Sequence, residues 1–279
     1  MRLLGVTLSI MVVGIGGCQH VGGLEQPDFA PTVPHVTVVT YNVNFGLAQP
    51  EHVTRFLSEA QASVICLQET HPRWEGILRT ALEEEYPHCV FQEWQEAGGM
   101  AVMSRHEVRR VRVLEPRAGW WPALLVDVAT PLGTIQVLNV HLKPPLTERG
   151  CISLGAYCRA PAVHCRELAE YLAYVDRSRP LIVAGDFNEN ELGMAMRSLE
   201  DQGFASALSS YDRRSKTWYW KTLLGLVVND RYDHILFNDH LDCTGAEVVA
   251  TAGSDHLPVR AVLVRREALV AADDTIRPR

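Results

Sequence analysis

Short strand-like segments outnumber helical segments in this sequence of 279 residues. Apolar runs bounded by turn residues predict strands at Val36–Val43, Ser63–Gln68, Met100–Ser104, Val108–Leu114, Ala123–Ala129, Thr134–His141, Leu181–Ala184, Tyr232–Phe237, Ala246–Thr251 and Val259–Val264. Helical spacing of apolar residues predicts helices at Pro50–Ala60, Arg73–Glu85, Ala160–Val175 and Glu189–Glu200. So few helices between so many strands exclude a simple alternating βαβ fold. Two mainly antiparallel sheets packed face to face, with helices outside, would bury the strands, and a single large sheet is the alternative.

Composition favours one ordinary globular domain over residues 35–265. Hydrophobic residues make up 47% and charged residues 21% of the chain, and no Gly/Ser-rich linker divides that region. The net charge of −7 argues against tight, salt-resistant binding to nucleic acid, because duplex-binding proteins usually carry a basic stripe. It does not exclude a phosphate ester as substrate, since bound cations can supply positive charge locally. We expect a monomer.

The first residues indicate export. The apolar run Leu3–Ile15 is too short to span a bilayer and fits the core of a signal peptide. Small residues then precede Cys18, which resembles the bacterial lipoprotein box, although Ile15 stands where leucine is usual. We therefore predict a signal peptide at 1–18, lipidation of Cys18, membrane attachment through that lipid, and a tether at 19–34. A plain secretory signal or an N-terminal anchor is the alternative. Gln19 favours the outer membrane of the cell envelope.

Six further cysteines follow, and the sequence leaves their pairing open. They are Cys66, Cys89, Cys151, Cys158, Cys165 and Cys243. An exported protein can form disulfides, and one is plausible near residues 151–165. Lys143–Cys158 holds two prolines and several small residues, and it is predicted to be a long surface loop. The polar tail at 266–279 is predicted to be disordered.

Five short polar segments lie at the ends of predicted strands, where a rigid scaffold can hold an active site. They are Thr40-Tyr41-Asn42-Val43-Asn44, Leu67-Gln68-Glu69-Thr70, Asn139-Val140-His141-Leu142, Gly185-Asp186-Phe187-Asn188 and Ser254-Asp255-His256-Leu257-Pro258. Each has an ordinary structural explanation when taken alone. Asp186 and Asn188 could cap a helix, Ser254-Asp255 could form a turn, and Glu69 could be a solvated strand end.

The segments together resemble the endonuclease/exonuclease/phosphatase superfamily, over about residues 36–264. Gly-Asp-Phe-Asn and Ser-Asp-His are the most specific matches, and Gln-Glu-Thr and Arg231-Tyr232-Asp233-His234-Ile235 support them. Six matching segments in the same order are not expected from unrelated caps and turns. The resemblance implies an α/β fold, namely a four-layer αββα sandwich of two mainly antiparallel sheets flanked by helices, with the site at one edge.

The resemblance also implies roles for individual residues. Glu69 matches the principal metal-binding carboxylate, and Asn42 and Asp255 match its neighbours. Oxygen ligands of this kind suit Mg²⁺ or Mn²⁺ better than zinc. The sequence departs from some abasic-site enzymes of the superfamily at Asn44, where those enzymes carry an aspartate. This weakens an assignment as an abasic-site endonuclease.

The remaining matched residues imply hydrolysis of a phosphoester. Asp186 matches the residue that orients or deprotonates the attacking water, and Asn188 matches a contact to the phosphate. His256 is expected to hydrogen-bond Asp233, which would favour the imidazolium form beside phosphate. His141 matches a histidine that donates to a phosphate oxygen or assists the leaving group.

The loops leave the substrate open. Trp218, in Thr217–Lys221, could stack on a base or enter a lipid interface, and Arg166 could contact phosphate. Gly119–Pro122 carries two further tryptophans, which could equally cover the core. The leading hypothesis is a nuclease-like phosphodiesterase at the cell envelope. A sphingomyelinase-like phospholipid hydrolase or a phosphatase is the alternative, and a non-catalytic binding protein is a third reading.

Overall fold

The computed structural model describes residues 24–46, 49–222 and 225–269. Cys18, the predicted signal peptide and most of the predicted tail lie outside these ranges. Within them, no helix combines the length and hydropathy needed to cross a bilayer. Residues 266–269 form a helical turn after the last strand. Part of the predicted tether packs on the domain, since the Asp28 amide donates to the Thr244 carbonyl at 2.7 Å.

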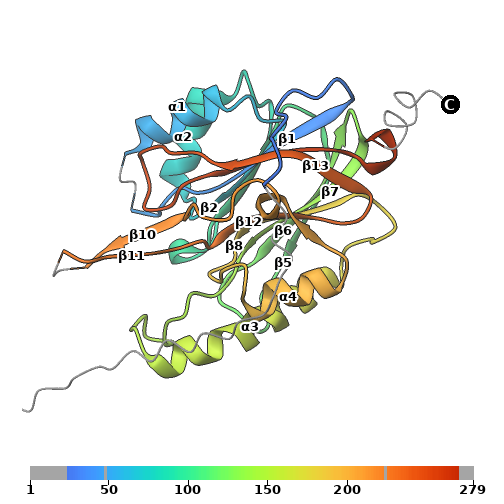
Figure 1. Cartoon of the computed structure of the whole chain (residues 1–279). Coiled ribbons are helices and arrows are strands. Elements are labelled where there is room, and N and C mark those ends of the chain that lie inside the picture. Colours follow the sequence, from blue (N-terminus) through green and yellow to red (C-terminus); the bar gives the residue numbers. More distant parts are fainter. Residues whose placement is uncertain (1–23, 47–48, 223–224, 270–279) are drawn as a thin grey trace, which may run out of the picture.

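Two six-stranded sheets form the centre of the domain (Figure 1). The first sheet has the order β13-β14-β1-β2-β4-β3, and the second has the order β5-β6-β7-β8-β12-β9. The first contains β1 (His35–Asn42), β2 (Val64–Gln68), β3 (His88–Gln92), β4 (Met100–Ser104), β13 (Leu241–Val248) and β14 (Val259–Arg265). The second contains β5 (Val108–Leu114), β6 (Ala123–Thr130), β7 (Gly133–His141), β8 (Leu181–Asp186), β9 (Ala205–Ser206) and β12 (Asp233–Phe237). Most neighbours are antiparallel, but β1–β2 and β7–β8 are parallel.

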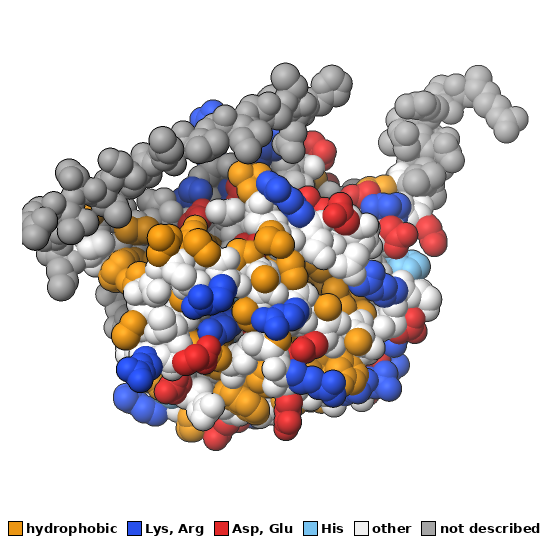
Figure 2. Space-filling model, turned by 90° about the horizontal axis from the view of Figure 1, so that it is seen from below, with side chains coloured by type: hydrophobic (Ala, Val, Ile, Leu, Met, Phe, Trp, Pro, Cys, Tyr) orange, Lys and Arg blue, Asp and Glu red, His pale blue; other side chains and the backbone are white. Residues whose placement is uncertain are grey.

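Helices cover the outer face of each sheet. α1 (Pro50–Glu59) and α2 (Pro72–Leu82) pack on the first sheet, and α3 (Leu154–Leu172) and α4 (Met194–Asp201) pack on the second. A third apolar cluster fills the space between the sheets. The predicted four-layer αββα sandwich is therefore confirmed. Figure 2 shows the outer face of the α3–α4 layer, where basic and acidic side chains alternate with hydrophobic ones and form no single basic stripe.

An amide pair joins the two sheets inside the core. Gln68 of β2 donates to the Asn139 side-chain oxygen of β7 at 2.7 Å, and both residues are fully buried. The Asn139 amide in turn donates to the carbonyls of Leu67 and Ala101 at 2.9 and 3.0 Å. Because a buried amide without partners is costly, this pairing favours one relative position of the sheets.

Several predicted boundaries were wrong. α3 begins at Leu154, inside the segment predicted as a loop, because its first turns expose apolar residues that break the expected helical pattern. α4 begins at Met194 instead of Glu189, because the residues before it form a turn in which the Gly193 amide donates to the Asn190 carbonyl at 2.9 Å. The structure adds β3, β9, the 3₁₀ helices Glu96–Gly98 and Ala207–Ser209, and a two-stranded hairpin of β10 (Trp218–Lys221) and β11 (Val227–Asp230).

The six cysteines of the described residues are all free thiols. The disulfide considered plausible near residues 151–165 is therefore absent. Cys158 and Cys165 lie seven residues apart on α3, which separates them by about 10 Å along the axis. A disulfide needs Cα atoms within roughly 7 Å.

Candidate active site

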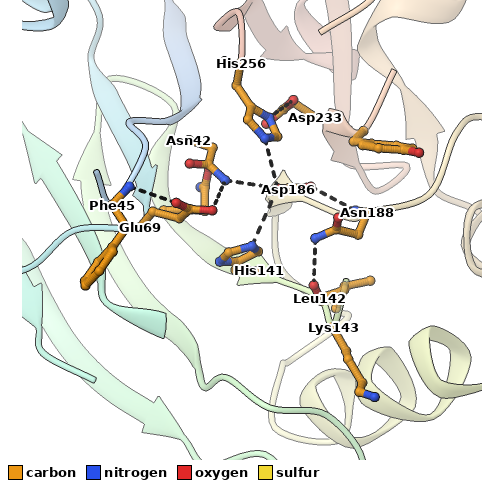
Figure 3. A network of polar contacts seen from close by, with 12 residues as sticks. Asn42, Phe45, Glu69, His141, Leu142, Lys143, Asp186, Asn188, Asp233 and His256 are labelled. Atoms are coloured by element: carbon orange, nitrogen blue, oxygen red, sulfur yellow. Dashed lines mark hydrogen bonds and ion pairs between the residues drawn. The ribbon is translucent and has the colours of Figure 1, made fainter. Parts of the chain in front are cut away.

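The carboxyl ends of both parallel strand pairs meet at one edge of the sandwich (Figure 3). In the first sheet, Asn42 ends β1 and Glu69 follows β2. In the second sheet, the register places His141 of β7 and Asp233 of β12 on either side of Asp186, which ends β8. Parallel strands present their carboxyl ends together, so side chains from distant parts of the sequence converge here.

Gly185 allows β7 and β8 to lie this close. Its φ of +150° is unfavourable for other residues, and a Cβ atom there would lie 1.9 Å from the Val140 carbonyl oxygen. Glu69 and Asn188 also have a left-handed backbone, with φ of 63° and 48°. Asparagine tolerates this conformation, whereas glutamate does so rarely, and such strain is typical of functional sites.

Asn42 connects the two sheets at the site. Its amide nitrogen donates to the Glu69 carboxylate at 3.0 Å and to the Asp186 carboxylate at 3.1 Å. The second Glu69 oxygen accepts from the Phe45 backbone amide at 2.8 Å. Glu69 is partly buried, whereas Asn42 and Asp186 are almost completely buried. The carboxylate of Glu69 is thus held in place while part of it still faces solvent.

His256 and Asp233 form a buried imidazole–carboxylate pair. His256 Nδ1 lies 2.8 Å from Asp233 Oδ2, which fixes the orientation of the ring. Burial alone would lower the pKa of His256, but the charges of Asp233 and Asp186 and the hydrogen bond together raise it to about 10. His256 is therefore an imidazolium at neutral pH, as the sequence predicted. Its Nε2 faces Asp186 at 3.7 Å.

Asp186 is the centre of the network. Burial raises its pKa to about 7, with the His256 charge opposing and the Asp233 charge adding to the effect. Its Oδ1 accepts from the Asn188 backbone amide at 2.8 Å, and the Asn188 side chain donates to the Leu142 carbonyl at 2.9 Å. A buried carboxyl with a pKa near neutrality can accept a proton from water and release it again.

His141 differs from His256 in charge. Its ring is buried, lies 3.8 Å from the Trp121 ring between centroids, and points Nε2 at Asp186 over 3.6 Å. Burial, followed by the charge of His256, lowers its pKa to about 3. His141 is therefore a neutral imidazole at pH 7. One charged and one neutral histidine approach the same carboxylate.

Asn44 joins Asp255 to this edge. The Asn44 side-chain nitrogen donates to Asp255 Oδ1 at 2.6 Å, and the Ser254 hydroxyl donates to the Asn42 carbonyl at 2.7 Å. The residue that departs from some abasic-site enzymes therefore has a positioning contact in this chain. Asp255 is exposed, so its carboxylate stays open to solvent.

The side chains at this edge fit a divalent cation. Carboxylates outnumber cationic groups, and the ion pairs of Asp186 and Asp233 are with histidines. Asp186, Asp233 and His256 each offer a ligand atom within 4.8 Å of the others, among the residues that the structure describes. However, Asp233 and His256 are already hydrogen-bonded to each other. Glu69 and Asp255 have solvent-facing carboxylate oxygens of the kind that Mg²⁺ prefers, so they fit the cation better.

Comparison with known proteins identifies the family. The chain matches the profile of the Endonuclease/Exonuclease/phosphatase family over residues 39–256, which include every polar strand end of the site. The protein belongs to this family. A search of curated protein sequences gave no match.

Solved structures of this family's fold resemble the chain closely in shape and weakly in sequence. TDP2 of D. rerio, complexed with a single-strand DNA product, gives a TM-score of 0.66 at 13% identity, covering 82% of this chain and 99% of that chain. An endonuclease/exonuclease/phosphatase from Beutenbergia cavernae gives 0.61 at 18% identity, with coverage of 84% and 72%. A functionally unknown conserved protein from Enterococcus faecalis gives 0.60 at 18% identity, with coverage of 82% and 100%.

The predicted substrate contacts lie in different places. Trp218 is next to the family site, because its ring stacks on Tyr232 at 5.3 Å and its backbone bridges to His256. Arg166 is not part of the network. It is exposed on α3, and its Nε donates to the Ala162 carbonyl of the same helix.

Sequence reasoning missed three contributors to the site. Gln68 and Asn139 stand inside the quoted motifs, but their pairing across the sheets was not foreseen. Trp121 was noted only in a loop, yet its ring covers His141. The presence of polar residues at strand positions that should be apolar was the available signal for the amide pair.

Proposed function

We propose that this protein is a divalent-metal-dependent phosphodiesterase, nuclease-like in substrate, acting at the bacterial cell envelope. Family membership supports phosphoester hydrolysis. The observation that carries the proposal is the convergence of two histidine rings on Asp186: Nε2 of His256 and of His141 lie 3.7 and 3.6 Å from its carboxylate, whose pKa burial raises to about 7. The likeness to a fold that binds a DNA product in TDP2 supports nucleic acid as the first substrate class to test.

The chain's own groups suit an in-line attack of water on phosphate. Asp186 accepts a proton from the water, and Asn42 and the Asn188 backbone amide hold its carboxylate in position. His256, held by Asp233, places positive charge beside the phosphate. The side-chain amide of Asn188 uses one N–H for the Leu142 carbonyl and has a second N–H that can donate to a phosphate oxygen. His141 is buried and neutral, so its ring N–H can donate a hydrogen bond to the departing oxygen.

Glu69, Asn42 and Asp255 would hold Mg²⁺ or Mn²⁺. A cation there would neutralise phosphate charge and stabilise the departing oxygen. Glu69→Gln keeps the shape of the side chain and removes its charge, so it should weaken Mn²⁺ binding measured by calorimetry. We also propose lipidation of Cys18, export, and a monomeric state.

The decisive experiment follows hydrolysis of bis(p-nitrophenyl) phosphate and of a single-stranded oligonucleotide, with and without Mg²⁺ or Mn²⁺. Metal-dependent cleavage of both substrates, lost in Asp186→Asn, would support the proposal. Absence of cleavage in every metal would contradict it and return attention to a binding protein.

A phospholipid phosphodiesterase is the second candidate, and the β10–β11 hairpin favours it. The hairpin adjoins the site through Trp218 and exposes Trp220 by 43% and Val227 by 56%, with Lys221 between them. Aromatic, aliphatic and basic residues together are typical of lipid interfaces. Faster hydrolysis of phosphatidylcholine vesicles than of oligonucleotides, together with vesicle binding lost in Trp220→Ser, would support this candidate.

A further inference from the structure

The residue after Asn188 is fixed at three of its atoms. Glu189 is buried, and its carbonyl oxygen lies 2.9 Å from His234 Nε2 of β12. Its Oε1 accepts from the Ala195 amide in the first turn of α4 at 2.9 Å. Its Oε2 lies 2.6 Å from His164 Nδ1 of α3. Glu189 is therefore held by a strand and two helices at once.

His164 connects this fixed residue to the chain that follows β7. Its second ring nitrogen, Nε2, lies 2.7 Å from the Lys143 carbonyl. Lys143 comes two residues after His141, and the His164 ring is buried. Because each nitrogen of His164 faces an acceptor, one ring bridges the chain after Asn188 and the chain after His141.

The backbone of Asn188 depends on such support. Its φ of 48° is a left-handed conformation that a residue with a side chain keeps only where the surroundings hold it. Its side-chain N–H donates to the Leu142 carbonyl at 2.9 Å (Figure 3). The bridge from Glu189 through His164 to Lys143 is a second, outer cross-link. It lies one residue further along both chains than the Asn188–Leu142 contact.

The two cross-links together decide where the remaining N–H of Asn188 points. A hydrogen bond to a phosphate oxygen gains strength as negative charge develops there in the transition state. A misplacement of about 1 Å can lower a catalytic rate by about 10²-fold. The outer cross-link acts through the position of Asn188, since both nitrogens of His164 are already engaged.

We propose that His164 and Glu189 are positioning residues for the phosphate contact of Asn188. The proposal rests on the proposed phosphodiesterase function and adds two residues outside the matched motifs. His164 stands 25 residues before Glu189, on a different element. The role depends on the hydrogen-bonded geometry of the bridge and not on its charge.

Steady-state kinetics on bis(p-nitrophenyl) phosphate tests this role. His164→Phe keeps a ring and removes both nitrogens, so kcat should fall by about tenfold while KM changes by less than about twofold. Glu189→Gln keeps the bridge without charge. Its amide can donate to a neutral His164, whose Nε2–H still donates to the Lys143 carbonyl. This conservative variant should keep kcat within about twofold of the parent value.

Stability is kept apart from position by a double variant. His164→Phe combined with Glu189→Gln leaves no buried charge unpaired, so it serves if the single variant does not fold. It lacks the bridge and should show the same fall in kcat. A kcat that falls as far in Glu189→Gln alone as in His164→Phe would overturn a role that depends on geometry.

A double-mutant cycle shows whether His164 acts through Asn188. Asn188→Ala should lower kcat by about 10²- to 10³-fold, and adding His164→Phe should lower it no further. Gln136→Leu is the matched control. This buried side chain also makes two hydrogen bonds between β7 and the chain after α3, but about 17 Å from His141 along the strand. Gln136→Leu should lose stability and keep its kcat.

Crystal structures of the parent and of His164→Phe test the bridge without any substrate. We expect Asn188 to leave its left-handed backbone in the variant and to lose the Leu142 carbonyl. That movement, in a parent that hydrolyses no phosphodiester, would contradict the proposed function and support the positioning. Hydrolysis by the parent, with an unmoved Asn188 and an additive effect of His164→Phe in the cycle, overturns the positioning and leaves the function standing.

Discussion

Among the described residues, two buried histidine–carboxylate pairs are joined by a hydrogen bond, and only one of them belongs to the candidate site. His256 and Asp233 approach to 2.8 Å, and His164 and Glu189 approach to 2.6 Å. In both pairs burial lowers the pKa of the histidine, and the carboxylate contacts more than compensate. Neither the contact nor the direction of the pKa shift separates the two pairs.

The second ring nitrogen does separate them. His256 Nε2 faces Asp186 across 3.7 Å, a gap that leaves the nitrogen reachable from the site. His164 Nε2 lies 2.7 Å from the Lys143 carbonyl, so both of its nitrogens face acceptors and both must donate. His164 thus links the chain after β7 to the chain after β8. A histidine with both nitrogens occupied holds structure, whereas one with a free nitrogen can act on a ligand.

The largest expected effect is on catalysis at the first pair. Asp186→Asn and His256→Ala should each lower kcat/KM for bis(p-nitrophenyl) phosphate by about 10²- to 10⁴-fold, since each removes a proton acceptor or a charge aimed at the phosphate. Steady-state kinetics on variants with a native circular dichroism spectrum tests this. Full activity in either variant would break the distinction between the pairs.

The second expected effect is a loss of stability at the His164–Glu189 pair. His164→Leu leaves the buried Glu189 carboxylate without its cation, which should cost about 3–5 kcal/mol of unfolding free energy. Urea unfolding measures the loss. Adding Glu189→Leu should restore a large part of it, and kcat/KM of the folded single variant should fall far less than in Asp186→Asn. A stable but inactive His164→Leu protein would assign His164 to the chemistry instead.

The pH dependence of stability sharpens the comparison. Glu167, beside His164, is fully buried, and burial raises its pKa to about 7. Its unfolded pKa is near 4.3, so the folded state binds more protons between these values and stability falls as pH rises from about 4.3 to 7. His164 acts in the same direction. Because folding raises its pKa, stability also falls as the pH rises above its unfolded pKa of about 6.5. Glu167→Gln should flatten the lower window in urea titrations at pH 4.5 to 7, and an unchanged slope there would contradict the assignment.

The smallest effect is expected at the Lys143 side chain. His164 and Glu167 contact only the backbone of Lys143, while its ammonium pairs with the exposed Glu148 at 2.8 Å. The ammonium also lies 4.3 Å from the Trp120 ring centroid. Lys143→Ala should therefore cost about 1–2 kcal/mol, the usual value of an ion pair together with a cation–π contact, and less than His164→Leu. Thermal unfolding of Lys143→Ala and of His164→Leu, measured side by side, tests whether the stabilising contact is made by the Lys143 backbone. An equal loss of stability in the two variants would assign the stabilisation to the Lys143 side chain instead.

Local signals in the sequence located the polar strand ends, and the family resemblance of the whole set then assigned them to one site. Asn42, Glu69, His141 and Asp186 each end or directly follow an apolar strand, so a pattern of a few residues reveals both the strand and its polar end. The many strands with few helices left a single large sheet open as an alternative. The layer order was predicted only from the family resemblance of the polar segments.

Contacts between distant residues could not be predicted in this way. Gln68 and Asn139 pair because two different sheets face each other, and nothing within a few residues of either specifies the partner. The same holds for His164 and Glu189, which lie on different elements. The start of α3 was missed for another reason, since exposed apolar residues such as Leu154 obscure the amphipathic pattern.

The pairing of β1 with β14 has a consequence for the order of synthesis. The first strand of the domain lies between β14 and β2, so the first sheet cannot close until the last strand has been made. His256 and Asp255 precede that last strand, and Asp233 lies only a little earlier. A chain still emerging from the ribosome therefore lacks the imidazole–carboxylate pair and Asp255 at the site. The site is complete only after β14 has been made and has paired with β1.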